Sequence, residues 1–134
     1  MSLVKRIRKA RRVYVVGNGG SFATAMHIVG DLEEAKIKAH ALNPASLTRT
    51  GNDKGYERIF SDWIALHGEK GDLLIALSGS GTSPNILKAI KTAKRIWMDT
   101  ELISWYLKDG MDMEMSEETM LTMGHQWKRS LKKR

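Results

Sequence analysis

The pattern of apolar and polar positions alternates between two periods along the chain. Val13 to Val16 and Leu73 to Leu77 are continuous apolar runs, which are typical of strands buried on both faces of a sheet. Between such runs, apolar residues recur at helical spacing, as Ala25, Ile28 and Leu32 do. The pattern predicts strands at 13–16, 37–42 and 73–77, helices at 21–35, 56–67 and from Pro84 through Ala93, two further strands at 102–106 and 111–115, and a last helix at 116–131.

Both buried strands end in a glycine-rich turn that leads into a helix. Strands that alternate with helices in this way form a mostly parallel, doubly wound sheet. We therefore expect an α/β fold, a three-layer αβα sandwich around a five-stranded sheet. At 134 residues the chain is too short for two complete domains, so we expect one domain that spans residues 1–134.

The net charge of +7 comes from the two ends of the chain. The basic N-terminal segment, residues 1–12, holds six Lys and Arg. The basic tail of the C-terminal helix region 116–134, residues 128–134, holds five. Neither of these basic stretches contains an acid, whereas the 11 bases and 15 acids between them leave the central part negative. Solvated helix ends explain this distribution. Nucleic acid is the less expected partner, because the sequence shows no aromatic-rich groove or known binding module.

Composition excludes several classes of function. The chain has no cysteine, so it has no disulfide framework, no thiolate metal site and no cysteine nucleophile. No stretch approaches the roughly 18 apolar residues of a membrane span, and the N-terminus lacks the apolar run of a signal peptide. We expect a cytoplasmic protein with no membrane partner.

The two glycine-rich turns carry the candidate chemistry. They are Gly17-Asn18-Gly19-Gly20-Ser21 and Ser78-Gly79-Ser80-Gly81-Thr82-Ser83. In a doubly wound sheet both follow the carboxyl ends of strands, where backbone N–H groups, helix N-termini and hydroxyls suit a phosphate dianion. Neither turn has the Gly-Lys-Ser/Thr ending of a P-loop, and Phe22 replaces the third glycine of the dinucleotide fingerprint, so no nucleotide cofactor is expected. The alternative is that glycine and serine only form tight turns.

Four motifs follow one another in a specific order. They are the first turn, then Met26-His27 with the acid Asp31, then Gly51-Asn52-Asp53-Lys54-Gly55-Tyr56, and then Leu77 to Asn85 around the second turn. Together they resemble the sugar isomerase (SIS) domain, and within it a shortened phosphoheptose isomerase. The resemblance implies a phosphorylated sugar as partner, and interconversion of sedoheptulose 7-phosphate and a heptose 7-phosphate through an enediol. The substrate and phosphate ligands that it implies are Asn18, Gly19, Gly20, Ser21, Asp53, Ser78, Ser80, Thr82, Ser83 and Glu117.

The resemblance also implies acid–base catalysis by two residues. His27 and Asp31 are four residues apart and share one face of a helix, which the first turn aims at the ligand. By resemblance, Asp31 stands where the family has its glutamate base, and His125 on the last helix is the acid. His27, Asp31, Glu117 and His125 also offer nitrogen and oxygen ligands for a divalent metal, and some relatives bind zinc there. The alternative for His27 and Asp31 is an ordinary exposed pair.

Two other functions stay open beside the isomerase. One is a non-catalytic module that binds a phosphosugar or a protein partner, as does a relative that associates with a replication initiator. The other is a nucleic-acid-associated protein that uses the basic termini, whose binding would fall steeply with added salt. The resemblance further implies a homo-oligomer, either a tetramer or a dimer.

Overall fold

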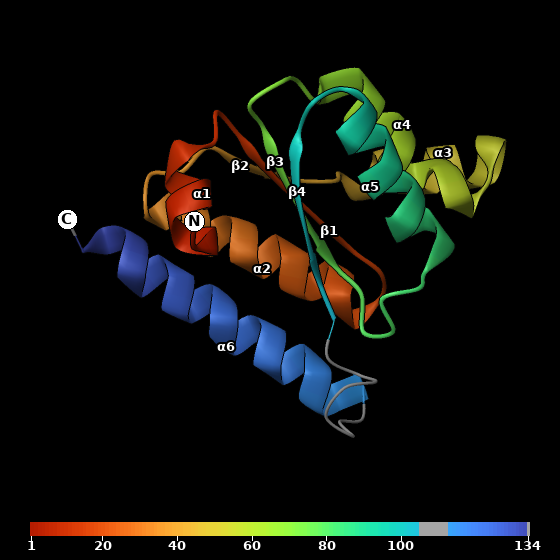
Figure 1. Ribbon diagram of the computed structural model, residues 1–134. Coiled ribbons are helices and arrows are strands. Elements are labelled where there is room, and N and C mark those ends of the chain that lie inside the picture. The colour runs from red at the N-terminus through yellow and green to blue at the C-terminus, as the bar shows by residue number, and fades with distance from the viewer. Residues whose placement is uncertain (105–112, 134) are drawn as a thin grey trace.

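The computed structural model describes residues 1–104 and 113–133, with side chains at 1–104 and 118–133. No helix in these residues is long and apolar enough to cross a membrane. Helices and strands alternate along the chain (Figure 1). In order they are α1 (Leu3–Lys9), β1 (Val13–Gly17), α2 (Gly20–Glu34), β2 (Ala39–Ala41), α3 (Pro44–Lys54), the 3-10 turn η1 (Tyr56–Arg58), α4 (Ile59–His67), β3 (Leu73–Leu77), α5 (Pro84–Arg95), β4 (Asp99–Ile103) and α6 (Met113–Lys132).

The strands form one parallel sheet in the order β2-β1-β3-β4. This confirms the predicted doubly wound sheet, but the described residues contain four strands where five were predicted. β4 begins at Asp99, before the predicted strand at 102–106. The reason is that this edge strand carries charged residues, which interrupt the apolar pattern on which the prediction depends.

The predicted fifth strand at 111–115 is wrong from residue 113 onward, and residues 111 and 112 lie outside the described part of the chain. Helix α6 begins at Met113 and continues to Lys132, so it includes the predicted helix at 116–131. Methionine and glutamate are good helix formers. Their propensity outweighs the short alternation of apolar and acidic residues that suggested a strand.

Helices cover both faces of the sheet, which gives the three predicted layers (Figure 1). Successive side chains of a strand point to opposite faces. Val13 and Val15 therefore pack with α1, α2 and α6, whereas Tyr14 and Val16 pack with α4 and α5. Each face has its own apolar core, and the sheet separates the two.

The carboxyl ends of β1 and β3 meet where the strand order reverses. β1 is followed by α2 on one face, and its neighbour β3 by α5 on the other. The two strands pair in register as far as Gly17 and Leu77, so the turns that follow them lie side by side. Such a switch point is the usual ligand position in open α/β sheets.

The sequence pattern does not predict α3. None of its residues is buried, so no apolar periodicity marks the helix. It begins instead with local signals, since the Asn43 side chain accepts a hydrogen bond of 2.7 Å from the backbone N–H of Ala45. Pro44 occupies the first turn, where its fixed φ suits a helix.

Candidate functional site

The first turn brings the backbone of β1 and α2 close together. A β-carbon at Gly17 would lie 2.6 Å from the carbonyl oxygen of Ser21, so only glycine fits there. Gly19 has a φ of +54°, a left-handed conformation that favours glycine. The Ser21 N–H donates to the carbonyl of Asn18 at 2.8 Å, which begins the helix. These contacts expose the backbone of Gly19 and Gly20 at the carboxyl edge of the sheet.

Ser21, a predicted phosphate ligand, faces α6. Its side chain is buried, and its hydroxyl donates to the sulfur of Met120 at 3.9 Å. In this arrangement the first turn offers a ligand the exposed Gly19 and Gly20 rather than the serine hydroxyl. The phosphate role of Ser21 stays a prediction.

Asn18 joins the two turns through a pair of reciprocal hydrogen bonds. Its amide donates to the Asn85 side-chain oxygen at 2.9 Å, and the Asn85 amide donates back at 2.8 Å. The Tyr56 hydroxyl donates to the same Asn18 oxygen at 3.1 Å. Asn85 and Tyr56 were not among the predicted ligands, although both belong to the motifs that carry the resemblance. They hold β1, η1 and α5 in fixed positions around the turns.

Hydroxyl groups gather in the second turn. Ser80 accepts hydrogen bonds from the N–H and the hydroxyl of Thr82, at 3.1 and 3.0 Å. Ser78 accepts from the Gly81 N–H at 3.1 Å, and its hydroxyl lies 3.3 Å from that of Ser83. Gly81 has a φ of +73°, which tightens the turn. The predicted ligands of this turn are therefore brought together.

This hydroxyl-rich turn leads directly into the N-terminus of α5. Ser83 is the N-cap residue, Pro84 follows it, and the Ser83 hydroxyl makes no hydrogen bond to the helix backbone. Backbone N–H groups and the positive end of the helix dipole favour an anion at such a position. The turn and the helix together form an arrangement suited to a phosphate group.

A second group of predicted residues meets between α2 and α6. The side-chain Nε2 of His27 lies 3.0 Å from Nε2 of His125, and each lies 3.6 to 3.7 Å from Oδ2 of Asp31. Asp31 is 5% exposed, and its Oδ2 has no hydrogen-bond partner among the described residues. Two imidazoles and a carboxylate within 4.8 Å can hold a divalent metal ion.

The close approach of α6 to α2 depends on Gly124. A β-carbon there would lie 2.7 Å from Cγ1 of Ile28, which is fully buried. Because glycine lacks this carbon, the two helices can pack closely enough to place His125 opposite His27. The sequence alone gave no sign of this contact.

Lys128 forms ion pairs with the buried carboxylate of Asp31 and with Glu34 at the end of α2. Its ammonium lies 2.9 Å from Oδ1 of Asp31 and 2.9 Å from Oε2 of Glu34, and Lys132 lies 3.4 Å from Glu34. Hydrogen bonds to Asp31 and Glu34 raise the pKa of Lys128 above its ordinary value. The same lysine, followed by Lys132, lowers the pKa of the Glu34 carboxyl. Lys128 was not predicted, because its partners lie on another helix.

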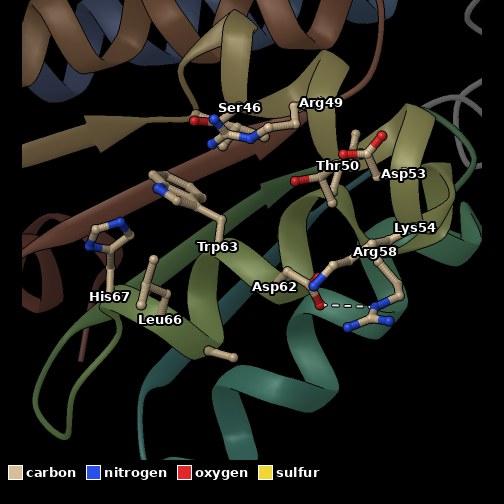
Figure 2. Close-up of a pocket in the computed structure, with 13 residues that line it drawn as sticks. Ser46, Arg49, Thr50, Asp53, Lys54, Arg58, Asp62, Trp63, Leu66 and His67 are labelled. Carbon is tan, nitrogen blue, oxygen red and sulfur yellow. Dashed lines mark hydrogen bonds and ion pairs between the residues drawn. The ribbon is translucent and has the colours of Figure 1, made fainter.

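Two predicted ligands are not brought to this group. Asp53 is exposed on α3 and accepts a hydrogen bond from the Asn52 amide at 3.0 Å. It lines a cavity of about 700 Å³ between α3 and α4, beside Thr50 and close to the Arg58–Asp62 ion pair of 3.1 Å (Figure 2). Residues from neither turn line this cavity. Glu117 lies on α6, and its side chain is outside the described residues.

Comparisons with known sequences agree with the motifs. Residues 1–103 match the SIS domain. The phosphoheptose isomerase of Rhodospirillum rubrum is 43% identical over 96 residues, which are 66% of this chain and 51% of that protein. That of Chlorobaculum parvum is 36% identical over 108 residues, 73% of this chain and 52% of that protein. The chain thus spans about half the length of these curated relatives.

Solved structures share the fold. Phosphoheptose isomerase GmhA from Neisseria gonorrhoeae matches with a TM-score of 0.85 and 24% identity, over 96% of this chain and 80% of that chain. The Vibrio vulnificus NanR protein complexed with ManNAc-6P matches with a TM-score of 0.61 and 16% identity, over 96% of this chain and 51% of that chain.

Proposed function

Because the chain belongs to the SIS domain family, we propose that it binds a phosphorylated sugar at the two turns and isomerises it. The proposed reaction interconverts sedoheptulose 7-phosphate and a heptose 7-phosphate, as the resemblance to phosphoheptose isomerases implies. The main support is the position of Asp31, a buried carboxylate with two imidazoles within 3.7 Å and with one oxygen that no described residue hydrogen-bonds.

The second turn is the proposed phosphate site. Ser78, Ser80, Thr82 and Ser83 supply hydroxyls, and the N-terminus of α5 supplies a dipole and backbone donors. The exposed backbone of the first turn completes the site from the neighbouring strand. Asn18 and Asp53 are proposed to contact the sugar, and Asp53 then requires the ligand to extend toward α3.

The proposed chemistry moves two protons. The carboxylate of Asp31 takes the proton from the carbon beside the carbonyl, while His125 gives a proton to the carbonyl oxygen, and an enediol results. Asp31 then gives its proton to the former carbonyl carbon, and His125 takes the proton of the other hydroxyl. The carbonyl has moved by one carbon, and both residues return to their starting states.

In a metal-bound form, which excludes proton transfer by the same Oδ2 and Nε2 atoms, His27, Asp31 and His125 are the proposed ligands of a zinc ion. Oδ2 of Asp31, which accepts no hydrogen bond from the part of the chain that the structure describes, and the two Nε2 atoms that face it are ligand types that zinc prefers. Three protein ligands leave a position open for substrate. A bound zinc ion would polarise the sugar carbonyl. Glu117 is proposed as a fourth ligand by resemblance only.

An isomerase assay on sedoheptulose 7-phosphate tests the proposal, with the full chain, with added zinc and with a chelator. We expect Asp31→Asn and His125→Ala each to lower kcat by about 100-fold or more, since each removes a group that transfers a proton. His40→Ala is the matched control, because His40 is exposed and contacts Tyr14 instead of the site. Wild-type activity in both site variants would refute the assignment.

Binding is measured separately by calorimetry. Ser80→Ala with Ser83→Ala should weaken phosphosugar binding, and Ser130→Ala, at an exposed position near the end of α6, should not. Binding without turnover in the wild type would favour the alternative function, a non-catalytic phosphosugar-binding or protein-interaction module. The ion pair between Asp31 and Lys128 supports this alternative, because Lys128 occupies one oxygen of the residue proposed as the catalytic base.

We also propose a homo-oligomer, a dimer or a tetramer, that works in the cytoplasm. The support for assembly is α3, which buries none of its residues within the chain, and Leu66, which is 78% exposed in the cavity beside it. Light scattering on the purified chain gives the mass directly. A monomer at micromolar concentration would refute this part of the proposal.

A further inference from the structure

The two basic ends of the chain meet in the folded protein. The guanidinium of Arg8 on α1 donates to the carbonyls of Ser130 and Lys133 at the end of α6, both at 2.9 Å. Figure 1 shows the first helix and the end of the last helix at the same end of the molecule. Charges that are far apart in the sequence therefore form one surface.

This surface continues along the amino ends of the strands. The Val13 N–H donates to the carbonyl of Lys38 at 2.8 Å, and the Leu73 N–H donates to that of Arg12 at 2.9 Å. Lys38 is exposed and Arg12 is half-buried at this edge. We call it the basal surface, and its bases include Lys9, Arg11, Arg12, Lys38 and Lys70. It lies at the edge of the sheet opposite to the two turns.

A groove of about 500 Å³ crosses the basal surface. Lys9, Arg11 and Lys70 line it, together with Trp97, whose side chain is 76% exposed. Trp97 also has a φ of +67°, which is rare for a bulky residue. The groove thus holds an exposed indole, in an uncommon backbone conformation, among cationic side chains.

The charge of the groove is only partly neutralised by the protein. Its acids are already paired, since Arg6 lies 2.8 Å from Asp99 and Arg11 lies 3.7 Å from Asp72. Lys9 and Lys70, in contrast, form no ion pair with any described residue. Both are exposed and can contact an anion, although the charge of Lys9 also acts on Asp99.

We propose that the basal surface binds single-stranded nucleic acid, with phosphates on Lys9 and Lys70 and a base stacked on Trp97. A positive groove with an exposed aromatic ring is the usual arrangement for this ligand, because every base has a face that can stack. This groove could not be predicted from the pattern of residues, because Trp97 and Lys9 are remote along the chain. This site is independent of the proposed isomerase site.

A membrane surface fits the groove less well. Among the described residues that line the groove, Met1 and Trp97 are the large apolar side chains that are exposed. Peripheral membrane binding draws on a broader apolar face in addition to cations. The groove offers one aromatic ring instead, which suits stacking on a base.

The test is fluorescence anisotropy of a labelled oligothymidylate of about 12 nucleotides, titrated with the full chain at several salt concentrations. Lys9→Gln with Lys70→Gln should reduce the slope of log K against log salt by about 1.4, since each phosphate contact on a single strand contributes about 0.7. Arg49→Gln with Lys54→Gln is the matched control, because it removes the same charge at the cavity between α3 and α4.

Trp97 is tested by two substitutions. Trp97→Asn should weaken binding about 5- to 150-fold, and asparagine tolerates the left-handed backbone, so the fold is kept. Trp97→Phe should retain most of the affinity, because a ring remains. Quenching of the tryptophan emission by the oligonucleotide should be lost in Trp97→Phe, which separates Trp97 from the other three tryptophans.

Several outcomes would overturn the proposal. They are no binding by the wild type, equal losses in the basal and control charge variants, and unchanged affinity in Trp97→Asn. Tighter binding to heparin or to phosphatidylglycerol vesicles than to the oligonucleotide would show a general anion or membrane surface instead.

Discussion

Gly124→Ala tests whether helix contact positions the candidate site. The new methyl group would lie 2.7 Å from Cγ1 of Ile28, about 1 Å closer than ordinary carbon–carbon contact. Ile28 is fully buried and cannot move away, so α6 must shift outward. Overpacking of this kind costs about 1–3 kcal/mol, whereas replacing a helical glycine by alanine gains about 1 kcal/mol. We expect a net loss of about 0–2 kcal/mol.

Gly30→Ala is the matched control for that change. Gly30 lies on α2 next to Asp31, and a β-carbon there would meet no atom within 4 Å. This variant should gain about 0.5–1 kcal/mol from helix propensity alone. Urea denaturation of both variants therefore separates packing from propensity, with an expected difference of about 1–3 kcal/mol.

A double-mutant cycle identifies the contact itself. Ile28→Ala removes the atoms that the new methyl group would meet, so Gly124→Ala should cost less in that background, with a coupling of about 0.5–3 kcal/mol. Gly124→Ala should also weaken zinc binding, because it moves His125 relative to His27. If Gly124→Ala stabilises the protein as much as Gly30→Ala does, the packing argument is refuted.

Three further predictions concern other parts of the chain. Asn85→Ala should cost about 1 kcal/mol in thermal denaturation and weaken phosphosugar binding, because it leaves the half-buried Asn18 amide without its acceptor, while Tyr56 still donates to the Asn18 oxygen. The hydrogen bond from Arg6 lowers the pKa of Asp99, so the Arg6–Asp99 pair stabilises the fold above the unfolded pKa of about 3.9, and this stabilisation is lost as pH falls. The Tm advantage of wild type over Asp99→Asn should therefore shrink below pH about 4. Gly17→Ala should prevent close packing on Ser21, lowering both Tm and phosphosugar affinity.

The parts of the fold that sequence predicts well are those held by apolar burial. The runs at 13–16 and 73–77 are continuously apolar, and the structure contains the fully buried strands β1 and β3 there. α3 escapes prediction, and β4 is predicted only at its last two residues, for the opposite reason. No residue of α3 is fully buried, although Leu47 packs partly buried against the core, and the signals for the helix are Asn43 and Pro44 at its start. β4 is an edge strand whose charges pair with Arg6 on a remote helix.

The candidate site divides in the same way. His27 and Asp31 share a helix face, so their spacing alone predicts the 3.6 Å contact that the structure contains. His125 joined them through the family resemblance, not through any local pattern. The contacts of Lys128 and Gly124 depend on how α6 packs across α2. No spacing of residues along the chain predicts that packing.

Lys128 is the basic residue that could link the proposed isomerase site to the basal surface, because it pairs with Asp31. Its ammonium is engaged by Asp31 and by Glu34, both at 2.9 Å, and these hydrogen bonds raise its pKa, so it is charged but not free to hold a phosphate. The unpaired lysines of the groove carry the nucleic acid instead. Since coupling between sites is reciprocal, we expect saturating phosphosugar to leave the oligonucleotide affinity unchanged. A measured change that disappears in Lys128→Gln would instead mean that Lys128 exchanges Asp31 for a phosphate, and that binding at the basal surface frees the proposed base.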